Sequence, residues 1–213
     1  ANRQCKDLLR RLKLAGEQTG PDVLPTHYSL VRQLHLGGSD MGREALAELQ
    51  EYLVLPSCHI TTLDLSYSQL DAFPLIQALR GNSSLTSLDV RMVVPRIGKM
   101  YQTISEVLLA PQCRCCLSYL RCDAFEVLEG DKTLSLREQP LESGAVRLVA
   151  GVLRHNRTIQ DVDLTATDLE SEGAIALASI LEFNTSLSAF RMLYNPAIDD
   201  EAKTALRQAV KKW

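Results

Sequence analysis

The chain has 213 residues, of which 46% are hydrophobic and 23% are charged, and its formal net charge at pH 7 is −3. This length and balance are typical of a globular chain that buries a sizeable core, as one domain or two small ones. The slight negative charge argues against general nucleic-acid binding, and no apolar run reaches the roughly 18 residues that a membrane-spanning helix needs.

The N-terminal end carries no targeting segment that the sequence reveals. Residues 1–11 are polar and charged, so they lack the apolar stretch of a secretory signal peptide. The chain begins with Ala1, inside a degenerate repeat, so we expect a fragment of a longer chain rather than a chain that has lost a signal. Three of the six cysteines crowd into residues 113–116, and a chain with this much core does not need disulfides. We therefore predict a reducing, intracellular, cytoplasmic location.

A strand-like pattern recurs along the chain. Its best copy is Ile159–Leu169, IQDVDLTATDL, which follows L-x-x-L-x-L-x-x-N-x-L with Thr167 at the asparagine position. The first position of each copy falls at Leu9, Val31, Ile60, Leu85, Leu117, Asp131, Ile159 and Leu187. Where the pattern is regular these positions lie 28 or 29 residues apart, which leaves room for one short strand and one helix per repeat.

The N-terminal half contains four predicted strands and three predicted helices. The strands are Leu9–Leu14, Val31–Leu36, Ile60–Leu65 and Leu85–Val90. Apolar stripes at helical spacing predict helices over 41–55, Ala72–Arg80 and Met100–Leu109. The connections 16–29 and 91–99 contain prolines, which remove a backbone donor and restrict the preceding residue, so we expect both to be irregular.

The repeat is broken in the middle of the chain. The predicted strand Leu117–Cys122 is followed by another, Asp131–Leu136, that begins only 14 residues later. Half a repeat leaves no room for a helix. We predict an irregular excursion over residues 113–131, extended or folded as a hairpin, with Glu129–Asp131 as its turn.

Regularity returns towards the C-terminus. The predicted elements are a helix from Ser143 to about Arg154, the strand Ile159–Leu164, the helix Ser171–Phe183 and the strand Leu187–Met192. A terminal helix over 199–213 is rich in lysine and arginine, which suits the polar cap that the end of a repeat stack needs.

The repeat period and the segments before the strands carry a family resemblance. The lead-ins are Asn82-Ser83-Ser84-Leu85, Asn156-Arg157-Thr158-Ile159 and Asn184-Thr185-Ser186-Leu187. Together with the L-x-x-L-x-L strands they resemble the ribonuclease-inhibitor-like class of leucine-rich repeats, found in NOD-like receptors, tropomodulins and Ran GTPase-activating proteins. The resemblance implies a eukaryotic protein-binding scaffold: one α/β domain over residues 1–213, built as a curved solenoid of about seven to eight repeats. A parallel sheet would line its concave face and helices its convex face, with a half-length repeat in the middle.

Side chains between the apolar positions of the strands should point to solvent on the concave face. We predict that they contact a partner, with Tyr119, Arg121 and Arg191 as the strongest anchors because Tyr and Arg are favoured at interface hot spots. The simpler alternative is a solvated polar face that keeps an open sheet soluble. The candidate residues are Arg11, Lys13, His35, Asp64, Asp89, Arg91, Tyr119, Arg121, Asp161, Asp163 and Arg191.

The cysteine cluster Cys113, Cys115, Cys116 and Cys122 leaves three interpretations open. Four thiolates could close a structural zinc site, but the spacing lacks the paired C-x2-C knuckles of such sites. A disulfide is the second interpretation, and buried or free thiols are the third, which we favour. Metal ligands and cofactors are therefore not predicted.

Asn82, Asn156 and Asn184 fit the glycosylation pattern, but all three fall at the same repeat phase. We interpret them as structural residues of the turn between helix and strand. His35 on one strand and Asp64 on the next could form an acid–base pair, although adjacent polar strands often produce such pairs by chance. The sequence contains no nucleophile elbow, P-loop, dinucleotide fingerprint or H-E-x-x-H motif, so we do not predict an enzyme.

Three hypotheses for function follow from the sequence. The first is an interaction module that binds a protein through its concave sheet or through the central irregular segment. The second is a structural subunit of a larger intracellular assembly, held through its helices or its ends. The third is a regulator of a nucleotide-dependent partner, as the resemblance to Ran GTPase-activating proteins implies.

Overall fold

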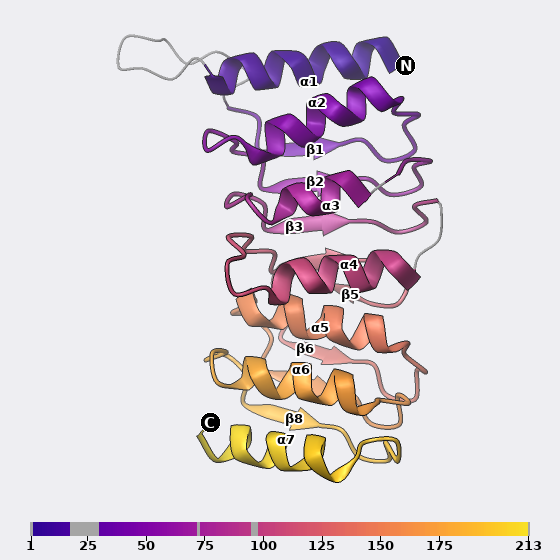
Figure 1. The fold of residues 1–213 in the computed structure, drawn as a ribbon, viewed down its shortest axis with the longest axis vertical. Coiled ribbons are helices and arrows are strands. Elements are labelled where there is room, and N and C mark those ends of the chain that lie inside the picture. The colour runs from indigo at the N-terminus through magenta and orange to yellow at the C-terminus, as the bar shows by residue number, and fades with distance from the viewer. Residues whose placement is uncertain (1, 18–29, 72, 95–97, 213) are drawn as a thin grey trace.

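The computed structural model describes residues 2–17, 30–71, 73–94 and 98–212, which form a stack of helices and strands (Figure 1). The N-terminal elements are α1 (Asn2–Glu17), β1 (Gln33–His35), α2 (Arg43–Val54), β2 (Thr62–Asp64), α3 (Phe73–Leu79), β3 (Ser87–Asp89) and α4 (Gly98–Leu109). The remaining elements are β4 (Tyr119–Arg121), β5 (Glu126–Val127), β6 (Thr133–Ser135), α5 (Ser143–His155), β7 (Asp161–Asp163), α6 (Ser171–Leu181), β8 (Ala189–Arg191) and α7 (Asp200–Lys212).

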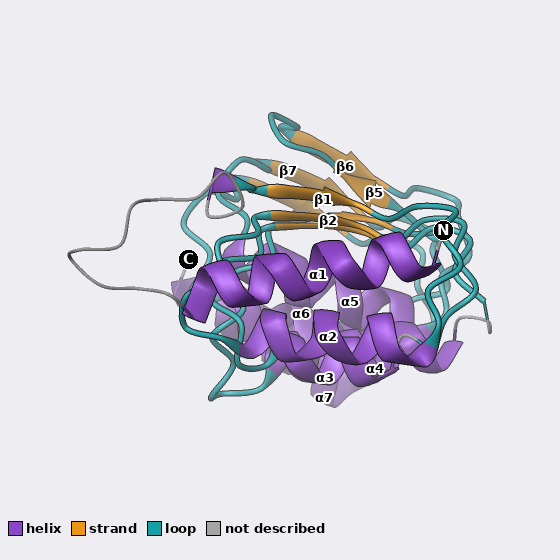
Figure 2. Ribbon diagram, turned by 90° about the horizontal axis from the view of Figure 1, so that it is seen from above, coloured by secondary structure: helices purple, strands orange, loops and turns teal. Residues whose placement is uncertain are grey.

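Strands and helices form two separate layers, with the strands on one side of the molecule and the helices on the other (Figure 2). The central residue of most strands is buried between the layers, because alternate strand side chains point to opposite faces. These central residues are Leu34, Leu63, Leu88, Leu120, Leu134 and Val162. Each helix buries one apolar side against the back of the strands and against its neighbours in the stack, as in α2 and α5. The predicted α/β layering is confirmed.

The sheet is not continuous. Strands β1 to β4 pair in parallel, and β5 then pairs antiparallel to β4 with Leu120 opposite Val127. Strands β6, β7 and β8 form a second parallel sheet. The predicted parallel sheet is therefore interrupted between β5 and β6, within the region where the repeat was expected to be irregular.

The predicted hairpin is present, but its turn lies earlier than expected. The chain reverses at Asp123 and Ala124, where the Cys122 N–H donates to the Phe125 carbonyl at 3.0 Å. The residues predicted as the hairpin turn form a second turn instead, in which Gly130 adopts φ +92° and the Asp131 N–H donates to the Leu128 carbonyl. This second turn leads the chain from β5 into β6.

The first predicted strand, Leu9–Leu14, is wrong, because these residues belong to the helix α1. Leu9 and Leu12 are buried, and Cys5 and Leu8 complete a stripe at helical spacing that packs beside α2. A six-residue window with apolar residues at its first, fourth and sixth positions fits both a strand of this repeat and one side of a helix. The predicted irregular segments around 18–29 and Pro95 lie outside the described residues.

The last helix begins where an acidic residue caps it. The Asp199 carboxylate accepts the N–H of Ala202 at 2.8 Å, so it satisfies one of the free donors at the start of α7. Across the ranges that the structure describes, no helix is long and apolar enough to cross a membrane.

Candidate functional site

The solvent-facing side of the two sheets, here called the sheet face, holds nine of the eleven predicted contact residues. His35, Asp64, Asp89, Arg91, Tyr119 and Arg121 lie on or next to the first sheet, and Asp161, Asp163 and Arg191 lie on the second. They come from successive strands whose parallel register places them in rows, for example Asp64 opposite Asp89 and Asp163 opposite Arg191. Most are held by a neighbouring strand or loop.

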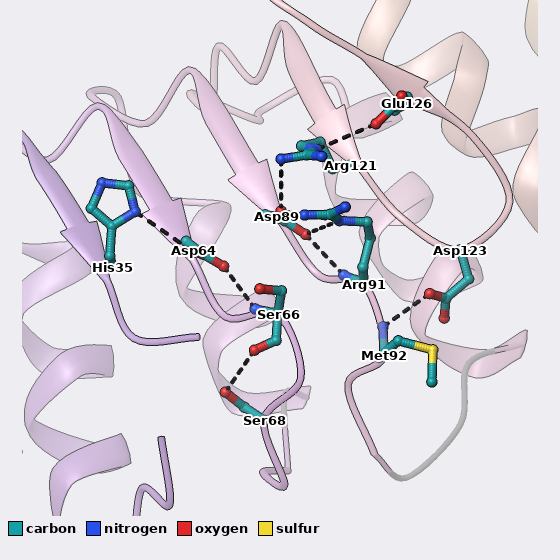
Figure 3. A network of polar contacts seen from close by, with 10 residues as sticks. All are labelled: His35, Asp64, Ser66, Ser68, Asp89, Arg91, Met92, Arg121, Asp123 and Glu126. Carbon is teal, nitrogen blue, oxygen red and sulfur yellow. Dashed lines mark hydrogen bonds and ion pairs between the residues drawn. The ribbon is translucent and has the colours of Figure 1, made fainter. Parts of the chain in front are cut away.

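At the N-terminal end of the sheet face, His35 meets Asp64 (Figure 3). The Nδ1 of His35 lies 3.6 Å from Oδ2 of Asp64, and the Ser66 N–H donates to Oδ1 of the same carboxylate at 2.9 Å. Burial alone would raise the pKa of Asp64, but the hydrogen bonds from Ser66 and His35 hold it below its ordinary value. The predicted proximity of His35 and Asp64 is confirmed.

Asp89 is the centre of a second group of contacts (Figure 3). Only 8% of this residue is exposed, and the Arg91 guanidinium donates to its carboxylate from Nε at 3.0 Å and from NH2 at 2.7 Å. Arg121 approaches Asp89 at 3.6 Å, and its Nε lies 3.3 Å from Glu126 in β5. The hydrogen bond to Asp89, more than any other influence, raises the pKa of Arg91. Two predicted contact residues, Arg91 and Arg121, are thus oriented by one nearly buried carboxylate.

The second sheet carries its own ion pair. Arg191 of β8 binds Asp161 of β7 through two bonds, NH1 to Oδ1 at 2.7 Å and NH2 to Oδ2 at 2.9 Å. Asp163 accepts the Thr165 N–H at 2.9 Å, and its hydrogen bonds with Thr165 are the main reason that its pKa is lowered. Half of the Arg191 side chain remains exposed, so the guanidinium is both oriented and accessible.

Arg11 and Lys13 are not on the sheet face. They lie on α1 in the helical layer, where Arg11 pairs with Asp7 one turn earlier and Lys13 pairs with Glu51 of α2. Their prediction as concave-face contacts is wrong, because it rested on the strand assignment of Leu9–Leu14.

The three asparagines of the glycosylation-like motifs are buried structural residues. Asn156 accepts the N–H groups of Thr158 and Ile159 and donates to the Ser118 carbonyl at 2.9 Å. Asn82 and Asn184 accept the corresponding N–H groups in their own repeats and donate to the carbonyls of Leu53 and Leu153. The structural interpretation is confirmed, because each of these side chains is buried and uses both its oxygen and its nitrogen in hydrogen bonds within the fold.

All four cysteines of the central cluster carry free thiols. Burial raises the pKa of Cys115 to about 12 and also raises the pKa of Cys113 and Cys122, so these sulfurs stay protonated at neutral pH. The described residues contain no group of three or more His, Cys, Asp or Glu side chains arranged to hold a metal.

Two features of the surface were not predicted from the sequence. One is a set of exposed side chains on residues with positive φ: Tyr67, Met92 and Tyr194 occupy the same repeat phase after β2, β3 and β8. The other is a groove of about 430 Å³ where the two sheets part, lined by residues from Cys122–Glu126 and Asp131–Leu136 and by Gln139. The short spacing of the central strands was its only sequence signal.

Comparisons with known proteins agree with this architecture. A family model described as a leucine-rich repeat matches residues 155–178. The human "NACHT, LRR and PYD domains-containing protein 5" is 28% identical over 196 residues, which cover 84% of this chain and 16% of the relative. The chain thus spans only about a sixth of that relative's length.

Two solved structures are similar over most of their length. One is described as "Leiomodin-1 Actin-Binding Site 2 (ABS2)", with 15% identity, a TM-score of 0.40, and coverage of 97% of this chain and 87% of that one. The other is the tropomodulin C-terminal domain of Caenorhabditis elegans, with 11% identity, a TM-score of 0.36, and coverage of 98% and 92%.

Proposed function

We propose that this chain, which is a leucine-rich-repeat protein, is an intracellular scaffold that binds another protein on its sheet face. The proposal extends the repeat architecture to a curved solenoid of about seven to eight repeats with the sheet face as its concave side. Strands lie about 4.8 Å apart and helices roughly 8–10 Å apart, so a stack with one helix per strand bends towards its strands.

The observation that carries this proposal is the fixed orientation of the charged side chains on the sheet face. Arg121 and Arg191 are held by carboxylates from neighbouring strands and still expose 40% and 50% of their side chains. A side chain that is already ordered loses less conformational entropy when a partner docks. The aromatic ring of Tyr119 lies half-buried on β4, two residues before Arg121, and supplies the apolar contact that hot spots combine with arginine.

The second candidate function is that of a structural subunit held through the helical layer. Large apolar side chains are exposed there, including Phe73 at the start of α3 and Phe183 just after α6, with 57% and 60% of each residue accessible. Such residues contribute to permanent interfaces when they form a contiguous patch. This observation favours a test that treats the two layers separately.

Affinity capture with two matched variants separates the two functions. The sheet-face variant Tyr119→Ala/Arg121→Ala/Arg191→Ala and the helix-layer variant Phe73→Ser/Phe183→Ser are immobilised beside wild type and exposed to a lysate of the cells that produce the protein. We expect the sheet-face variant to lose the proteins that wild type captures and the helix-layer variant to keep them. The opposite result would support the structural subunit, and equal capture by all three would contradict both.

A further inference from the structure

The two sheets are separated by an open groove between β5 and β6. Figure 2 shows that these strands lie further from the helices than β1 and β2 do. The groove has a volume of about 430 Å³, and its walls come from the hairpin β4–β5 on one side and from β6 on the other. Its size falls in the range of binding pockets in proteins.

The wall formed by β6 is an unpaired strand edge. The Lys132 carbonyl and the Leu136 N–H bond to the β7 side. Because backbone groups alternate along a parallel strand, those of Thr133 and Ser135 point the other way, into the groove. Within the described residues β6 pairs only with β7, and both Thr133 and Ser135 are exposed.

The opposite wall presents the edge of β5. Cys122 and Phe125 are hydrogen-bonded across the hairpin, and the next pair is Arg121 and Glu126. In an antiparallel ladder the next pair is not hydrogen-bonded, so the backbone N–H and carbonyl of Glu126 face the groove. The neighbouring outward N–H, that of Leu128, is already bonded to the Asp131 carboxylate at 2.7 Å. The open edge is therefore short, about one strand residue long on this side.

The groove has an apolar floor and an acidic rim. Cys122, Phe125, Leu134 and Leu136 line it and are all nearly buried. Its charged lining residues are Asp123, Glu126 and Asp131, and none is basic. Glu126 is partly neutralised by Arg121, whereas Asp123 and Asp131 accept only backbone N–H groups.

The groove continues towards the helices. A second cavity of about 370 Å³ shares Asp123, Ala124 and Gln139 with the first and reaches Tyr101 of α4. The Tyr101 hydroxyl is buried at this end of the groove, close to Cys122 and to the backbone of Ala124.

We propose that an extended segment of the protein partner adds as a strand between β5 and β6, with apolar side chains on the groove floor and lysine or arginine side chains against its acidic rim. The inserted backbone pairs with Thr133 and Ser135 on one edge and with Glu126 on the other, which is recognition by strand addition. Alternation of side chains along a strand sends every second residue to the floor and the others to the rim. This inference rests on the proposed protein-binding function and names the chemistry of its partner.

Binding of a synthetic peptide tests the inference directly. The probe is the acetylated and amidated peptide KVKVKVK, whose binding to the whole chain is measured by isothermal titration calorimetry. We expect saturable binding that weakens at least tenfold when alternate backbone amides of the peptide are N-methylated, because methylation removes strand pairing but keeps every charge. Equal binding of the methylated peptide, or of EVEVEVE, would overturn the inference.

Two variants place the peptide in the groove. Asp123→Asn/Glu126→Gln keeps one acceptor oxygen on each side chain but removes two charges from the rim, and Glu170→Gln/Glu201→Gln removes two charges elsewhere. We expect a loss of at least fivefold in KVKVKVK affinity for the first variant and a change below twofold for the second. Equal losses would mean that the peptide senses only net charge, which would contradict a site in the groove.

Amide hydrogen exchange gives a readout that needs no variant. On saturation with KVKVKVK the N–H groups of Thr133 and Ser135 should become protected, and those of β1 and β8 should not change. Binding without protection of these two amides would overturn strand addition. The proposed function fails separately, if the sheet-face variant captures the same proteins as wild type, and that variant should still bind the peptide because its changes leave the β6 edge intact.

Discussion

Strands and helices are stacked differently at two junctions of the molecule, the one between α5 and α6 and the one between α4 and α5. At the first, one strand separates successive helices, and β6, β7 and β8 stay paired. At the second, β4, β5 and β6 all lie between the two helices in the sequence, yet α4 and α5 are direct neighbours in the stack (Figure 1). From β3 to β6 three strand steps need about 14 Å if all are paired, whereas one helix step supplies roughly 8–10 Å. Three paired steps do not fit this span, so β5 and β6 lie further from the helices and the sheet opens between them (Figure 2), while the contact of α4 with α5 holds the stack together.

The hydrogen bonds at the two junctions differ accordingly. At regular junctions an asparagine after one helix donates to a carbonyl at the end of the preceding helix, as Asn184 does to Leu153. At the break Arg154 takes this part, since its NH1 donates to the carbonyls of Leu108 at 3.3 Å and Leu109 at 3.1 Å. Asn156 is then free to reach the Ser118 carbonyl before β4. The break in the sheet is thus compensated by two side chains. Arg154 bonds to the end of α4, and Asn156 bonds to the Ser118 carbonyl.

The largest expected effect on stability comes from removing the side-chain amide of Asn156. Asn156→Ala leaves the N–H groups of Thr158 and Ile159 without their acceptor in a buried turn. At about 1–3 kcal/mol for each unsatisfied buried group, we expect the free energy of unfolding to fall by about 3 kcal/mol. Urea denaturation followed by circular dichroism measures it.

Asn184→Ala is the matched variant at the regular junction, with the same two N–H acceptor contacts. If Asn156→Ala lowered the free energy of unfolding much less than Asn184→Ala, the contacts of Asn156 would contribute little at the break, and the loss of strand pairing there would not be compensated. Similar losses in both variants would support the compensated junction.

A smaller effect is expected where the helices touch. A Cβ added at Gly151 of α5 would lie 2.9 Å from Cβ of Leu108, an atom fixed to the backbone of α4. Overpacking costs about 1–3 kcal/mol, and the gain in helix propensity returns about 1 kcal/mol, so Gly151→Ala should destabilise by about 1 kcal/mol. Thermal unfolding measures the change.

The corresponding glycine of the regular junction supplies the contrast. A Cβ at Gly173 would lie 2.8 Å and 2.9 Å from methyl carbons of Val146 and Leu169 and 3.1 Å from Cβ of Val146, so its contact with a backbone-attached carbon is looser than at Gly151. Gly173→Ala should therefore destabilise less than Gly151→Ala. Equal destabilisation by both variants would show that the α4–α5 contact is no tighter than its neighbour.

The sequence predicted the regular half of this comparison well. Strands β1, β2, β3 and β7 lie within the spans that the L-x-x-L-x-L pattern predicted. An apolar residue flanked by polar ones fixes which side of a strand faces the core when only one side of the sheet is buried. The same pattern failed at Leu9–Leu14, where helical spacing fits equally well and the partner α2 decides. Local pattern could not choose between the two.

The position of the break in the sheet could be predicted from the sequence, but the opening between β5 and β6 could not. The 14-residue spacing excluded a helix between Leu117 and Asp131, but the opening of the sheet depends on the spacing of α4 and α5, which are over thirty residues apart in the sequence. The candidate contacts show the same limit. Alternation predicted that Arg121 and Arg191 face solvent, whereas the carboxylates that hold them follow from strand register.

The smallest predicted effect is a dependence on pH that originates at the break. Burial, with Arg154 and Arg157 nearby, lowers the pKa of His155 at the end of α5, and its Nε2 is buried with no hydrogen-bond partner in the part of the chain that the structure describes. A histidine whose pKa is lower in the folded state binds its proton more readily when unfolded. Its contribution to stability is present above its unfolded pKa of about 6.5 and is lost as the pH falls below it.

His155→Gln should therefore reduce the loss of stability of the chain between pH 7 and pH 5, by less than the effects above because the side chain is only half-buried. His59, between α2 and β2, also has its pKa lowered by burial and by Arg32, and it is the matched variant in the N-terminal sheet. Urea midpoints measured at both pH values should converge more in His155→Gln than in His59→Gln. The reverse order would mean that His59, in the regular repeats, contributes more to the loss of stability in acid than His155. The prediction that the pH dependence originates at the break would then be wrong.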